Sequence, residues 1–570
     1  MVTAELCHHN LGAEEIVQDG KSYLRRIQCK AQAGKKYILY KYSSIVTGND
    51  DFSDFIGETV KRCHQAKAAG YETLLGRSSE VWENYWAVSD VEIEGDPEGQ
   101  FALRYSIYQL LIIAPAHSDK LSIPARGLSG QVYKGAIFWD TEIFMLPFFI
   151  YTNPSIARNL LMYRCHTLDG ARRKAKEYGY QGAFYAWESQ ETGDDACTHF
   201  NITDIFTGRP MRTYFRDKQI HISADIAYAI WQYVTLTGDE SLLLDGGAEV
   251  ILECARFFYS YAYFKPQKNR FELLDVTGPD EYHERFNNNA YTNKMVKHTL
   301  RIALDVLDLL KAKYREKYDD LVTRLEFEED MTNIAEMYSK LYVPEPDRNT
   351  KVIEQFDGYH SLEDVSLDEL KSRIINKNEY LGGGNGLATN TQILKQADVI
   401  LMLHLFKNQY DIDTLKVNWD YYEPRTEHGS SLSPCVYALV ASEVGYTDYA
   451  YKYFLKTSTI DLTGEAKQFV GDLYIGGTHP AANGGSWMSA ILGFCGIRGN
   501  EDCLYINPRL PEKWNSVKFR IIYKNQRLEI YISKSEVRLT LEKGPDQAVS
   551  IKGRKLTAKA GQTIAAAYSA

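Results

Sequence analysis

The sequence lacks the features that mark secreted, metal-binding and nucleic-acid-binding proteins. Its nine cysteines are scattered and contain no C-x-x-C pair, a pattern that fits neither a disulfide framework nor a zinc site. No basic stretch followed by an apolar run occurs at the start, so no secretory signal is expected and a cytoplasmic location is predicted. The net charge is −10 without a long basic run, which argues against nucleic acid as a partner. The sequence contains no long apolar run, so no membrane partner is expected.

The composition is that of an ordinary soluble globular protein. Hydrophobic residues make up 44% and charged residues 25% of the chain, values close to the average. At 570 residues the chain is too long for one small core, which predicts one large domain with appendages or two to three domains. The 41 Tyr and 8 Trp exceed the usual share of aromatic residues. Because sugar-binding clefts use aromatic faces, this surplus mildly favours carbohydrate as a ligand.

A polar loop in the middle of the chain is the strongest candidate for catalysis. Four carboxylates fall within residues 275–284, broken by a Gly-Pro pair and followed by an Asn run, which predicts a loop. A carboxyl of Asp280 or Glu281, with Tyr282 and His283 beside it, has what a general acid needs, because neighbours can raise its pKa. The alternative interpretation is an acidic surface loop with Asn in turn positions.

Two pairs of neighbouring residues join an indole to a carboxylate. They are Trp139-Asp140 and Trp187-Glu188. A monosaccharide site uses a ring face for stacking and a carboxylate that accepts hydrogen bonds from hydroxyls. A helix start with Asp140 or Thr141 as its cap is the alternative for the first pair. Either pair alone is a weak signal.

A glycine-rich stretch at residues 382–386 precedes Lys395 and Gln396. Its spacing matches neither of the common phosphate-binding loops, so we interpret it as a mobile connection. The pattern leaves open whether Lys395 and Gln396 belong to a solvated face or to a site.

His428, Ser430 and Ser431 stand together at a predicted helix start. Backbone N–H groups and the helix dipole would add to these donors, which predicts an anion-binding group. A Ser-His nucleophile pair competes with this interpretation, although no G-x-S-x-G motif is present. The neighbouring Glu427 is expected to point away, because a carboxylate would repel the anion. His479, in a second glycine-rich turn, joins the same predicted group.

Together these loops resemble glycoside hydrolase family 65, the inverting disaccharide phosphorylases. The most specific pieces are Phe138–Glu142, Trp187–Ser189, Gly278–His283 and the Asn-Ala-Tyr-Thr-Asn segment that ends at Asn293. The resemblance implies that Glu281 is the general acid. It also implies that the glucosyl unit is bound by Trp139, Asp140, Lys395 and Gln396, together with Trp187 and Glu188. The phosphate is expected to bind at His428, Ser430, Ser431 and His479.

The resemblance also implies a mainly α fold with an (α/α)₆ barrel. The expected domains are a remnant of an N-terminal β-sandwich at 1–48, a helical linker at 49–99, the catalytic barrel at 100–498 and a C-terminal β-sandwich domain at 499–570. Because only the last strands of the first sandwich are recognised, an N-terminal truncation is expected. Within the barrel, Ser223 is predicted to cap a helix that ends at Thr237-Gly238. Residues 190–219 are predicted to shape the acceptor subsite.

The predicted activity is inverting phosphorolysis of an α-linked glucosyl disaccharide to β-glucose 1-phosphate and a free acceptor. The expected partners are a disaccharide and phosphate, and a homodimer is left open. No metal or other cofactor is expected, because the polar loops lack ligand spacings. One alternative is an inverting α-glucoside hydrolase of the trehalase or kojibiase type, which needs a second carboxylate to activate water. The other is a catalytically impaired sugar-binding fragment.

Overall fold

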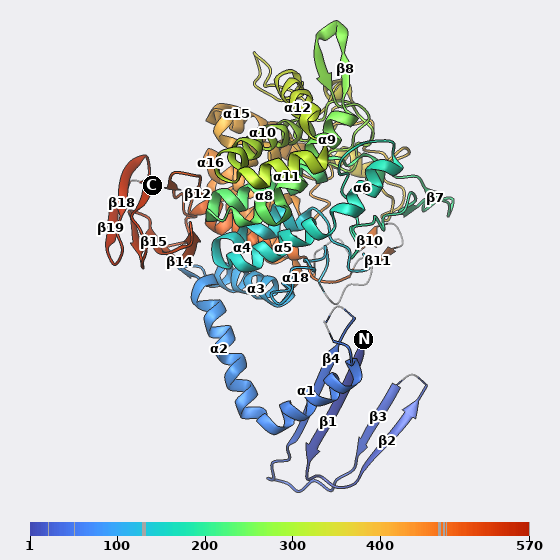
Figure 1. Ribbon diagram of the computed structural model, residues 1–570, viewed down its shortest axis with the longest axis vertical. Helices are drawn as coiled ribbons and strands as arrows, with labels where there is room; N and C mark the ends of the chain where they lie inside the picture. Colours follow the sequence, from blue (N-terminus) through green and yellow to red (C-terminus); the bar gives the residue numbers. More distant parts are fainter. Residues whose placement is uncertain are drawn as a thin grey trace. The chain divides into compact units, whose positions relative to one another are not determined.

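The chain forms two compact units, Met1–Ala87 and Val88–Ala570, in the computed structural model (Figure 1). Among the described residues, no helix has the length and apolar character needed to cross a bilayer. The structure describes the whole chain except positions 21, 49, 51, 128–132, 465–468, 471–472, 475 and 569–570, and it describes only the backbone at 469–470 and 473–474.

In its described residues, the first unit contains two separate antiparallel strand pairs. β1 (Val2–His9) pairs with β4 (Leu39–Val46), and β2 (Glu14–Asp19) pairs with β3 (Ser22–Ile27). Helix α1 (Phe55–Ala69) packs against β1 and β4, and α2 (Tyr71–Ser89) follows it. Few side chains of this unit are buried, and several large apolar ones are exposed: Ile16, Tyr23, Leu24, Leu39 and Ile45. The unit therefore has only a small core of its own.

Six helices in the described part of the second unit pack in a closed cycle, each against the next. They are α4 (Leu146–Thr152), α8 (His221–Thr237), α10 (Ala290–Lys313), α14 (Val399–Leu405), α16 (Ser433–Val444) and α19 (Pro480–Met488), which returns to α4. Every residue of α4 and α19 is buried. A Cβ on Gly484 would lie 2.1 Å from the carbonyl oxygen of Phe144, so only glycine permits the close approach of α19 there.

A second set of helices covers the six from outside. Each packs against members of the cycle: α3 (Pro97–Ile113) on α19, α5 (Pro154–His166) on α4 and α8, α9 (Ala248–Tyr261) on α8 and α10, α12 (Glu328–Lys340) on α10, α15 (Ile412–Tyr422) on α14 and α16, and α17 (Thr447–Ser458) on α16 and α19. In α12 only Ile334 and Met337 are buried, which is typical of a helix with one face on a core. Helix α3 differs, because Phe101, Tyr108 and Ile112 are exposed on it.

Helix α8 corrects one prediction and confirms another. It begins at His221 without a side-chain cap, so the prediction that Ser223 caps it is wrong. The Ser223 hydroxyl instead accepts from the Tyr185 N–H at 2.9 Å and donates to the Ala183 carbonyl. The predicted end at Thr237 is confirmed, with Gly238 in the left-handed conformation.

The C-terminal part is a small strand domain of two sheets. The first sheet has the order β19-β16-β15-β14-β5, with all neighbours antiparallel, and the second has the order β12-β13-β17-β18. Val517, Phe519 and Ile521 alternate with polar residues and are buried, as the period of two predicts. The sequence did not predict strand β5, which lies between α2 and α3 in the chain. The strands are β5 (Val91–Glu94), β12 (Ile497–Gly499), β13 (Leu504–Ile506), β14 (Ser516–Tyr523), β15 (Gln526–Ser533), β16 (Glu536–Leu541), β17 (Gln547–Ile551), β18 (Arg554–Ala558) and β19 (Thr563–Ala567).

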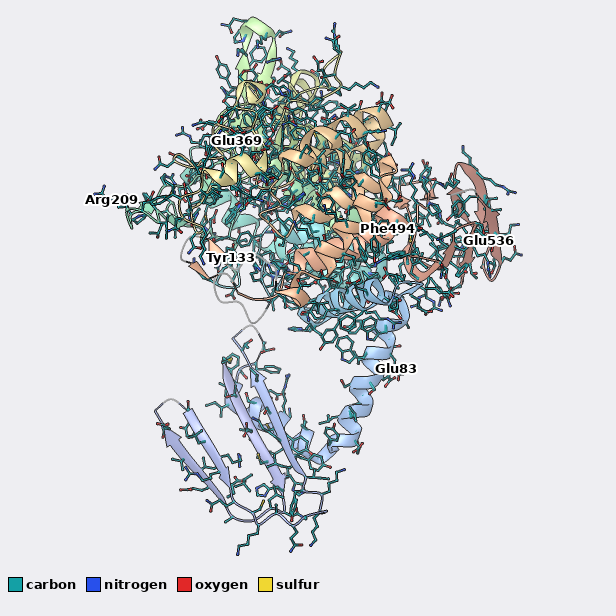
Figure 2. All side chains as sticks on the ribbon, turned by 180° about the vertical axis from the view of Figure 1, so that it is seen from behind. Glu83, Tyr133, Arg209, Glu369, Phe494 and Glu536 are labelled. Atoms are coloured by element: carbon teal, nitrogen blue, oxygen red, sulfur yellow. The ribbon has the colours of Figure 1, made fainter. Side chains whose placement is uncertain are left out.

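An aromatic cluster joins the helices to these strands. The ring of Phe494 lies 5.6 Å from Phe454 of α17 and 5.1 Å from Trp514, which precedes β14 (Figure 2). The three side chains are buried, so the strand domain shares a core with the helices. The remaining elements are short or peripheral: η1 (Thr141–Met145), α6 (Leu168–Glu177), β6 (Ile202–Thr203), β7 (Pro210–Met211), α7 (Phe215–Lys218), η2 (Leu243–Gly247), β8 (Tyr263–Lys265), η3 (Pro266–Lys268), β9 (Arg270–Glu272), α11 (Arg315–Leu325), η4 (Tyr359–Ser361), α13 (Leu367–Ser372), η5 (Lys407–Gln409), η6 (Glu423–Arg425), α18 (Ile460–Thr463), β10 (Phe469–Val470), β11 (Leu473–Tyr474) and η7 (Ser489–Phe494).

Candidate active site

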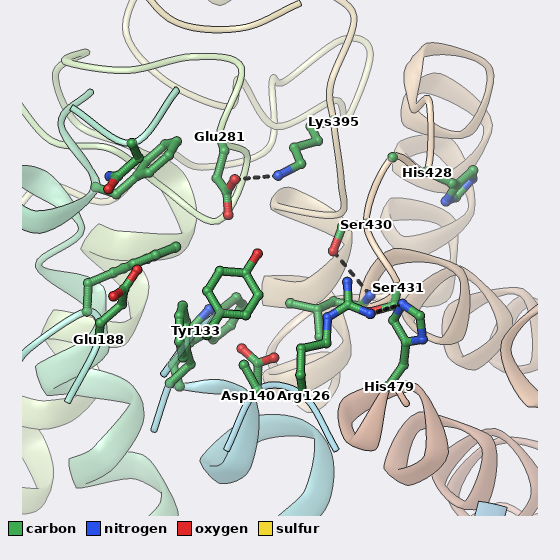
Figure 3. A pocket seen from close by; sticks show the side chains of 18 of the residues that line it. Arg126, Tyr133, Asp140, Glu188, Glu281, Lys395, His428, Ser430, Ser431 and His479 are labelled. Carbon is green, nitrogen blue, oxygen red and sulfur yellow. Dashed lines mark hydrogen bonds and ion pairs between the residues drawn. The ribbon is translucent and has the colours of Figure 1, made fainter. Parts of the chain in front are cut away.

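A cavity of about 680 Å³ opens where loops enter the central helices (Figure 3). Asp140 stands directly before η1, Glu281 is in the loop before α10, Lys395 precedes α14 and His479 stands directly before α19. The N-terminal ends of several helices therefore face one space, where their positive dipole ends favour negative charge.

The structure brings together ten of the eleven residues predicted for the site. Gln396 is the exception, since its amide donates to the Pro279 carbonyl behind the cavity wall. The cavity is lined by the other ten: Trp139, Asp140, Trp187, Glu188, Glu281, Lys395, His428, Ser430, Ser431 and His479.

Glu281 and Lys395 form an ion pair at one wall of the cavity. Burial works to lower the pKa of Lys395, but the adjacent Glu281 charge outweighs it and raises the pKa of the ammonium above its usual value. Both side chains are only 15% exposed. The ion pair therefore holds the Glu281 carboxylate in one position.

The fully buried Asp280 fixes the loop that carries Glu281. One carboxylate oxygen accepts from the backbone N–H of Lys395 at 2.8 Å, and the other lies 2.5 Å from Nδ1 of His283. Nε2 of His283 is 2.8 Å from the Thr391 carbonyl, so the imidazole bridges two loops. Because the carboxylate of Asp280 is used in this way, Glu281 is the carboxyl of this loop that faces the cavity.

Asp140 faces the cavity and does not cap the helix that follows it. No cap hydrogen bond is made by its side chain, which is 9% exposed. Burial, and then the charge of Glu281, raise the pKa of Asp140 to about 7. A carboxyl that is partly protonated near neutral pH can both donate to and accept from sugar hydroxyls.

Arg126 and His479 form the wall across from Glu281 (Figure 3). A guanidinium only donates hydrogen bonds, so Nε2 of His479 accepts from Arg126. Nδ1 of His479 then carries the proton and donates to Asp461 at 2.6 Å. Burial lowers the pKa of Arg126, and no carboxylate in the described part of the chain forms an ion pair with it. A half-buried guanidinium without an ion-pair partner can bind an anion through charge-assisted hydrogen bonds.

The loop before α16 contributes Ser430 and Ser431 to the same wall. His428 also lines the cavity, but its ring is turned away (Figure 3) and lies 2.9 Å from the Ser433 hydroxyl and 3.1 Å from the Tyr453 hydroxyl. Burial lowers the pKa of His428 to about 3, so the ring is neutral at pH 7. To reach an anion in the cavity, the ring would have to rotate and give up both contacts.

Glu427 points away from the cavity, as predicted. Its carboxylate accepts a hydrogen bond from the Tyr282 hydroxyl, and the residue is not part of the lining. The candidate base of a water-activating mechanism in this loop is therefore engaged elsewhere.

Aromatic side chains form the floor around Glu188. The ring of Trp187 stacks on Phe215 with centroids 5.3 Å apart, and its indole donates to Gln219 at 2.8 Å. Burial raises the pKa of Glu188, whose carboxylate lies 3.6 Å from the Lys134 ammonium. The exposed Phe200 and its neighbours at 198–202 complete this side, which brings part of the predicted acceptor segment to the cavity.

Arg126 and Tyr133 are cavity residues that the site prediction missed. The only signal for Arg126 was its place before a glycine, where a Cβ on Gly127 would lie 2.0 Å from the Thr478 hydroxyl. That contact places Arg126 beside His479, but the two are 353 residues apart in the chain. Among the described residues, no group of three or more His, Cys, Asp or Glu side chains could hold a metal ion.

Two family models match the chain. Residues 104–488 match the "Glycosyl hydrolase family 65 central catalytic domain", and residues 497–558 match the C-terminal domain of the same family. All the loops that line the cavity on both walls lie within the first match.

Several curated proteins are similar over nearly the whole chain. A nigerose phosphorylase from Lachnoclostridium phytofermentans is 49% identical over 539 residues, which cover 95% of this chain and 71% of that protein. A 1,2-alpha-glucosylglycerol phosphorylase from Bacillus selenitireducens is 41% identical, with 95% and 70% covered. A kojibiose phosphorylase from Halothermothrix orenii is 36% identical, with the same coverage. A solved structure from the human microbiome, provisionally described as a kojibiose phosphorylase, superposes with a TM-score of 0.80 at 25% identity and covers 96% of this chain and 77% of that chain.

Proposed function

The chain belongs to glycosyl hydrolase family 65, and from this premise we propose that it cleaves an α-linked glucosyl disaccharide by phosphorolysis with inversion. The products are β-glucose 1-phosphate and a free acceptor. The observation that carries the proposal is a cavity with Glu281 at one wall and the half-buried Arg126 guanidinium at the other, with no carboxylate of the described residues at ion-pair distance from Arg126. Phosphate is already an anion and needs no base, so one acid and one anion pocket are chemically sufficient.

Glu281 acts in this proposal as the general acid that protonates the glycosidic oxygen. Support comes from its position on a loop fixed by Asp280 and from its contact with Lys395.

The glucosyl unit binds, in this proposal, among Trp139, Asp140, Trp187, Glu188 and Lys395. The cavity offers it ring faces together with carboxyls and an ammonium, the mixture that sugar hydroxyls need. Gln396 supports this subsite from behind, through its hydrogen bond to the Pro279 carbonyl in the acid's loop.

Phosphate binds at the wall formed by Arg126, Ser430, Ser431 and His479. Arg126 supplies the charge, and the hydroxyls supply donors. Asp461 orients the His479 ring through Nδ1, so Nε2 faces the phosphate once Arg126 turns to it and accepts a hydrogen bond from a P–O–H group. His428 is the fourth predicted ligand, and we assign it the lesser role of shaping the loop, since both its nitrogens are engaged.

Water as the nucleophile is the competing proposal. An inverting hydrolase needs a carboxylate base that faces the anomeric carbon across roughly 6.5–9.5 Å from the acid. Glu427 is bonded to Tyr282 outside the lining, and the opposite wall presents a cation instead. This geometry favours phosphate.

We further infer that the six cyclically packed helices and the six that cover them form an (α/α)₆ barrel that runs from Pro97 to Met488, close to the predicted 100–498. Support comes from the closing contact of α19 with α4 and from the alternation of inner and outer helices along the chain. The strands at 1–48, the segment 49–99 and the sheets at 499–570 are then accessory parts.

The proposal is tested with nigerose, kojibiose and trehalose as substrates, in buffers with and without inorganic phosphate. We expect release of glucose 1-phosphate from at least one disaccharide, at a rate that saturates with phosphate. Release of two free sugars at a rate independent of phosphate would identify a hydrolase. Sugar binding without turnover would identify the impaired fragment.

A further inference from the structure

A second cavity, of about 420 Å³, lies at the other ends of helices that begin at the candidate active site. Trp139 and Asp140 face the first cavity, whereas Pro147 and Tyr151, on the helix that follows them, face the second. Lys395 and His404 are related in the same way along α14. The two cavities are therefore separate spaces that share helices, and the second does not belong to the proposed reaction.

Polar side chains without partners converge on this second cavity. The Gln232 side-chain oxygen is buried and accepts no hydrogen bond. Arg498 lies 5.9 Å from the Tyr505 ring, and within the described residues it makes no ion pair or hydrogen bond. Within the same residues, the hydroxyl of Tyr228 and the ring nitrogens of His298 and His404 also make no ion pair or hydrogen bond. The Gln232 oxygen is fully buried, and a buried polar atom is nearly always bonded, while the other four side chains are half-buried and line the cavity, so together they offer a ligand several donors and acceptors.

The charge state of the two imidazoles narrows the chemistry of the ligand. Burial, aided by nearby Lys294 and Lys407, lowers the pKa of His298 to about 4 and that of His404 to about 3. Both rings are therefore neutral at pH 7, and each offers one donor and one acceptor. The Gln232 amide likewise offers both. A hydroxyl group, which donates and accepts, matches this set better than an anion, which only accepts.

The position of the cavity also favours a neutral ligand over an anion. It lies along the C-terminal halves of α8 and α14, whose exposed carbonyl ends carry negative potential and disfavour an anion. Glu501 and Asp502 also line the cavity and balance the charges of Arg498 and Lys407. Arg498 keeps its N–H donors available to a ligand.

Aromatic rings supply the remaining element. Tyr151, Tyr228 and Trp231 line the cavity together with aliphatic side chains of the helices. Rings beside mixed donors and acceptors are what sugar sites use, and a volume of about 420 Å³ lies within the usual range for small-molecule sites. We propose that this cavity is a second binding site, for a neutral sugar of monosaccharide size, distinct from the candidate active site. The inference does not rest on the proposed phosphorolysis.

The test uses D-glucose as the probe and saturation-transfer NMR as the readout, which detects weak binding. In the Asp140→Asn variant, whose first cavity is impaired, we expect glucose signals to persist. Adding Gln232→Leu, which keeps the shape but removes the amide, should weaken the remaining binding about fivefold, the effect of losing roughly one hydrogen bond. Adding Trp231→Ala should abolish it.

The matched control is Gln409→Leu, the same substitution at an exposed residue that does not line the cavity. It should leave binding unchanged. Because Gln232→Leu also removes an unbonded buried oxygen, the variant should unfold at the same temperature as the parent or higher. Loss of all glucose signal in Asp140→Asn alone, or full binding in the variant that combines Asp140→Asn, Gln232→Leu and Trp231→Ala, would overturn the inference. Phosphorolysis by the Gln232→Leu variant, assayed separately, reports on the proposed function and not on this site.

Discussion

At the residue scale, Glu281, which forms an ion pair with Lys395 at the cavity wall, is the proposed general acid. Glu281→Gln keeps the shape and the hydrogen bonds but carries no transferable proton. We expect kcat to fall by about 10²- to 10⁴-fold with little change in phosphate binding. Steady-state kinetics at saturating disaccharide measures this.

Glu427→Gln is the matched control, since it makes the same change in a carboxylate that bonds Tyr282 outside the cavity. Its kcat should stay within about tenfold of the parent value. A larger loss in Glu427→Gln than in Glu281→Gln would assign the essential carboxylate to the loop before α16.

Arg126 provides the second prediction at this scale. Arg126→Met keeps the length of the side chain and removes its charge and its donors. A hydrogen bond to a charged group contributes about 1.5–3 kcal/mol, so KM for phosphate should rise about ten- to a hundredfold. KM for the disaccharide should change little. His428→Ala is the comparison, and we expect a smaller rise, because its ring bonds Ser433 and Tyr453. Equal effects would show that the His428 ring turns into the cavity.

Much of the candidate site could be predicted from the sequence because its residues stand in short, unusual stretches. Glu281 belongs to a stretch with four carboxylates in ten residues, and Trp139 stands directly before Asp140. Arg126 could not be found in this way, since its role depends on His479, which lies 353 positions later. The orientation of His428 was also out of reach. It depends on Tyr453 of another helix.

At the scale of elements, helix ends show which local signals are reliable. Gly238 was predicted as the end of α8, and the conformation requires it, because φ is 74° there. Gly238→Ala should lower the free energy of unfolding by about 1 kcal/mol through left-handed strain. Gly384→Ala is the control, since no atom lies within 4 Å of its Cβ and its φ is not positive, and it should change stability little. Urea denaturation measures both, and equal values would contradict the strain argument.

Ser223 shows the limit of the same reasoning. Serine is a favoured cap, yet here its hydroxyl bonds the Tyr185 and Ala183 backbone of a distant loop, and the helix starts two residues earlier. Tertiary contacts thus override the local preference. The alternating strands after residue 516 were predictable from their period, but the pairing of β5 with β14 was not. That pairing joins segments more than 400 residues apart.

Asp398, which lies buried behind the loop that carries Glu281, predicts a dependence of stability on pH. Burial, and then the charge of Asp280, raise the pKa of Asp398 from 3.8 to about 7. Between these values the folded protein keeps a proton that the unfolded chain releases. The stabilisation of the folded state by protonated Asp398 is therefore complete below about pH 4 and is lost as the pH rises through 7. Between pH 5 and pH 8 the parent should lose up to about 3 kcal/mol of unfolding free energy relative to Asp398→Asn.

Denaturant titrations of both proteins at the two pH values measure this difference. Comparing the pair cancels the contributions of groups that both share, such as Glu249, whose pKa is lowered to about 2 chiefly by its bond with Arg324. Parallel pH profiles for the two proteins would show that Asp398 is ionised in the folded state across this range.

At the scale of the whole molecule, the cavity is assembled from loops that lie far apart in the chain. Glu281 comes from the loop before α10, Arg126 from the segment before η1 and His479 from the position before α19. Since α19 closes the helix cycle on α4, the proposed phosphate wall is complete only when this last helix is in place. The site is thus a product of the complete helical body and not of any single motif.

This arrangement predicts the stereochemistry of the product. Glu281 stands at one wall, and Arg126 with His479 stands across the cavity (Figure 3), so a glucosyl unit between them would be protonated on one face and attacked by phosphate on the other. Attack opposite the leaving group inverts the anomeric carbon, and an α-glucoside gives β-glucose 1-phosphate. Proton NMR of the early reaction mixture distinguishes the anomers, and the phosphate ester does not interconvert them. Accumulation of the α-anomer would require a covalent intermediate and a second carboxylate close to the anomeric carbon. In that case Asp140 or Glu188, the other carboxylates of the cavity, would take the role of nucleophile.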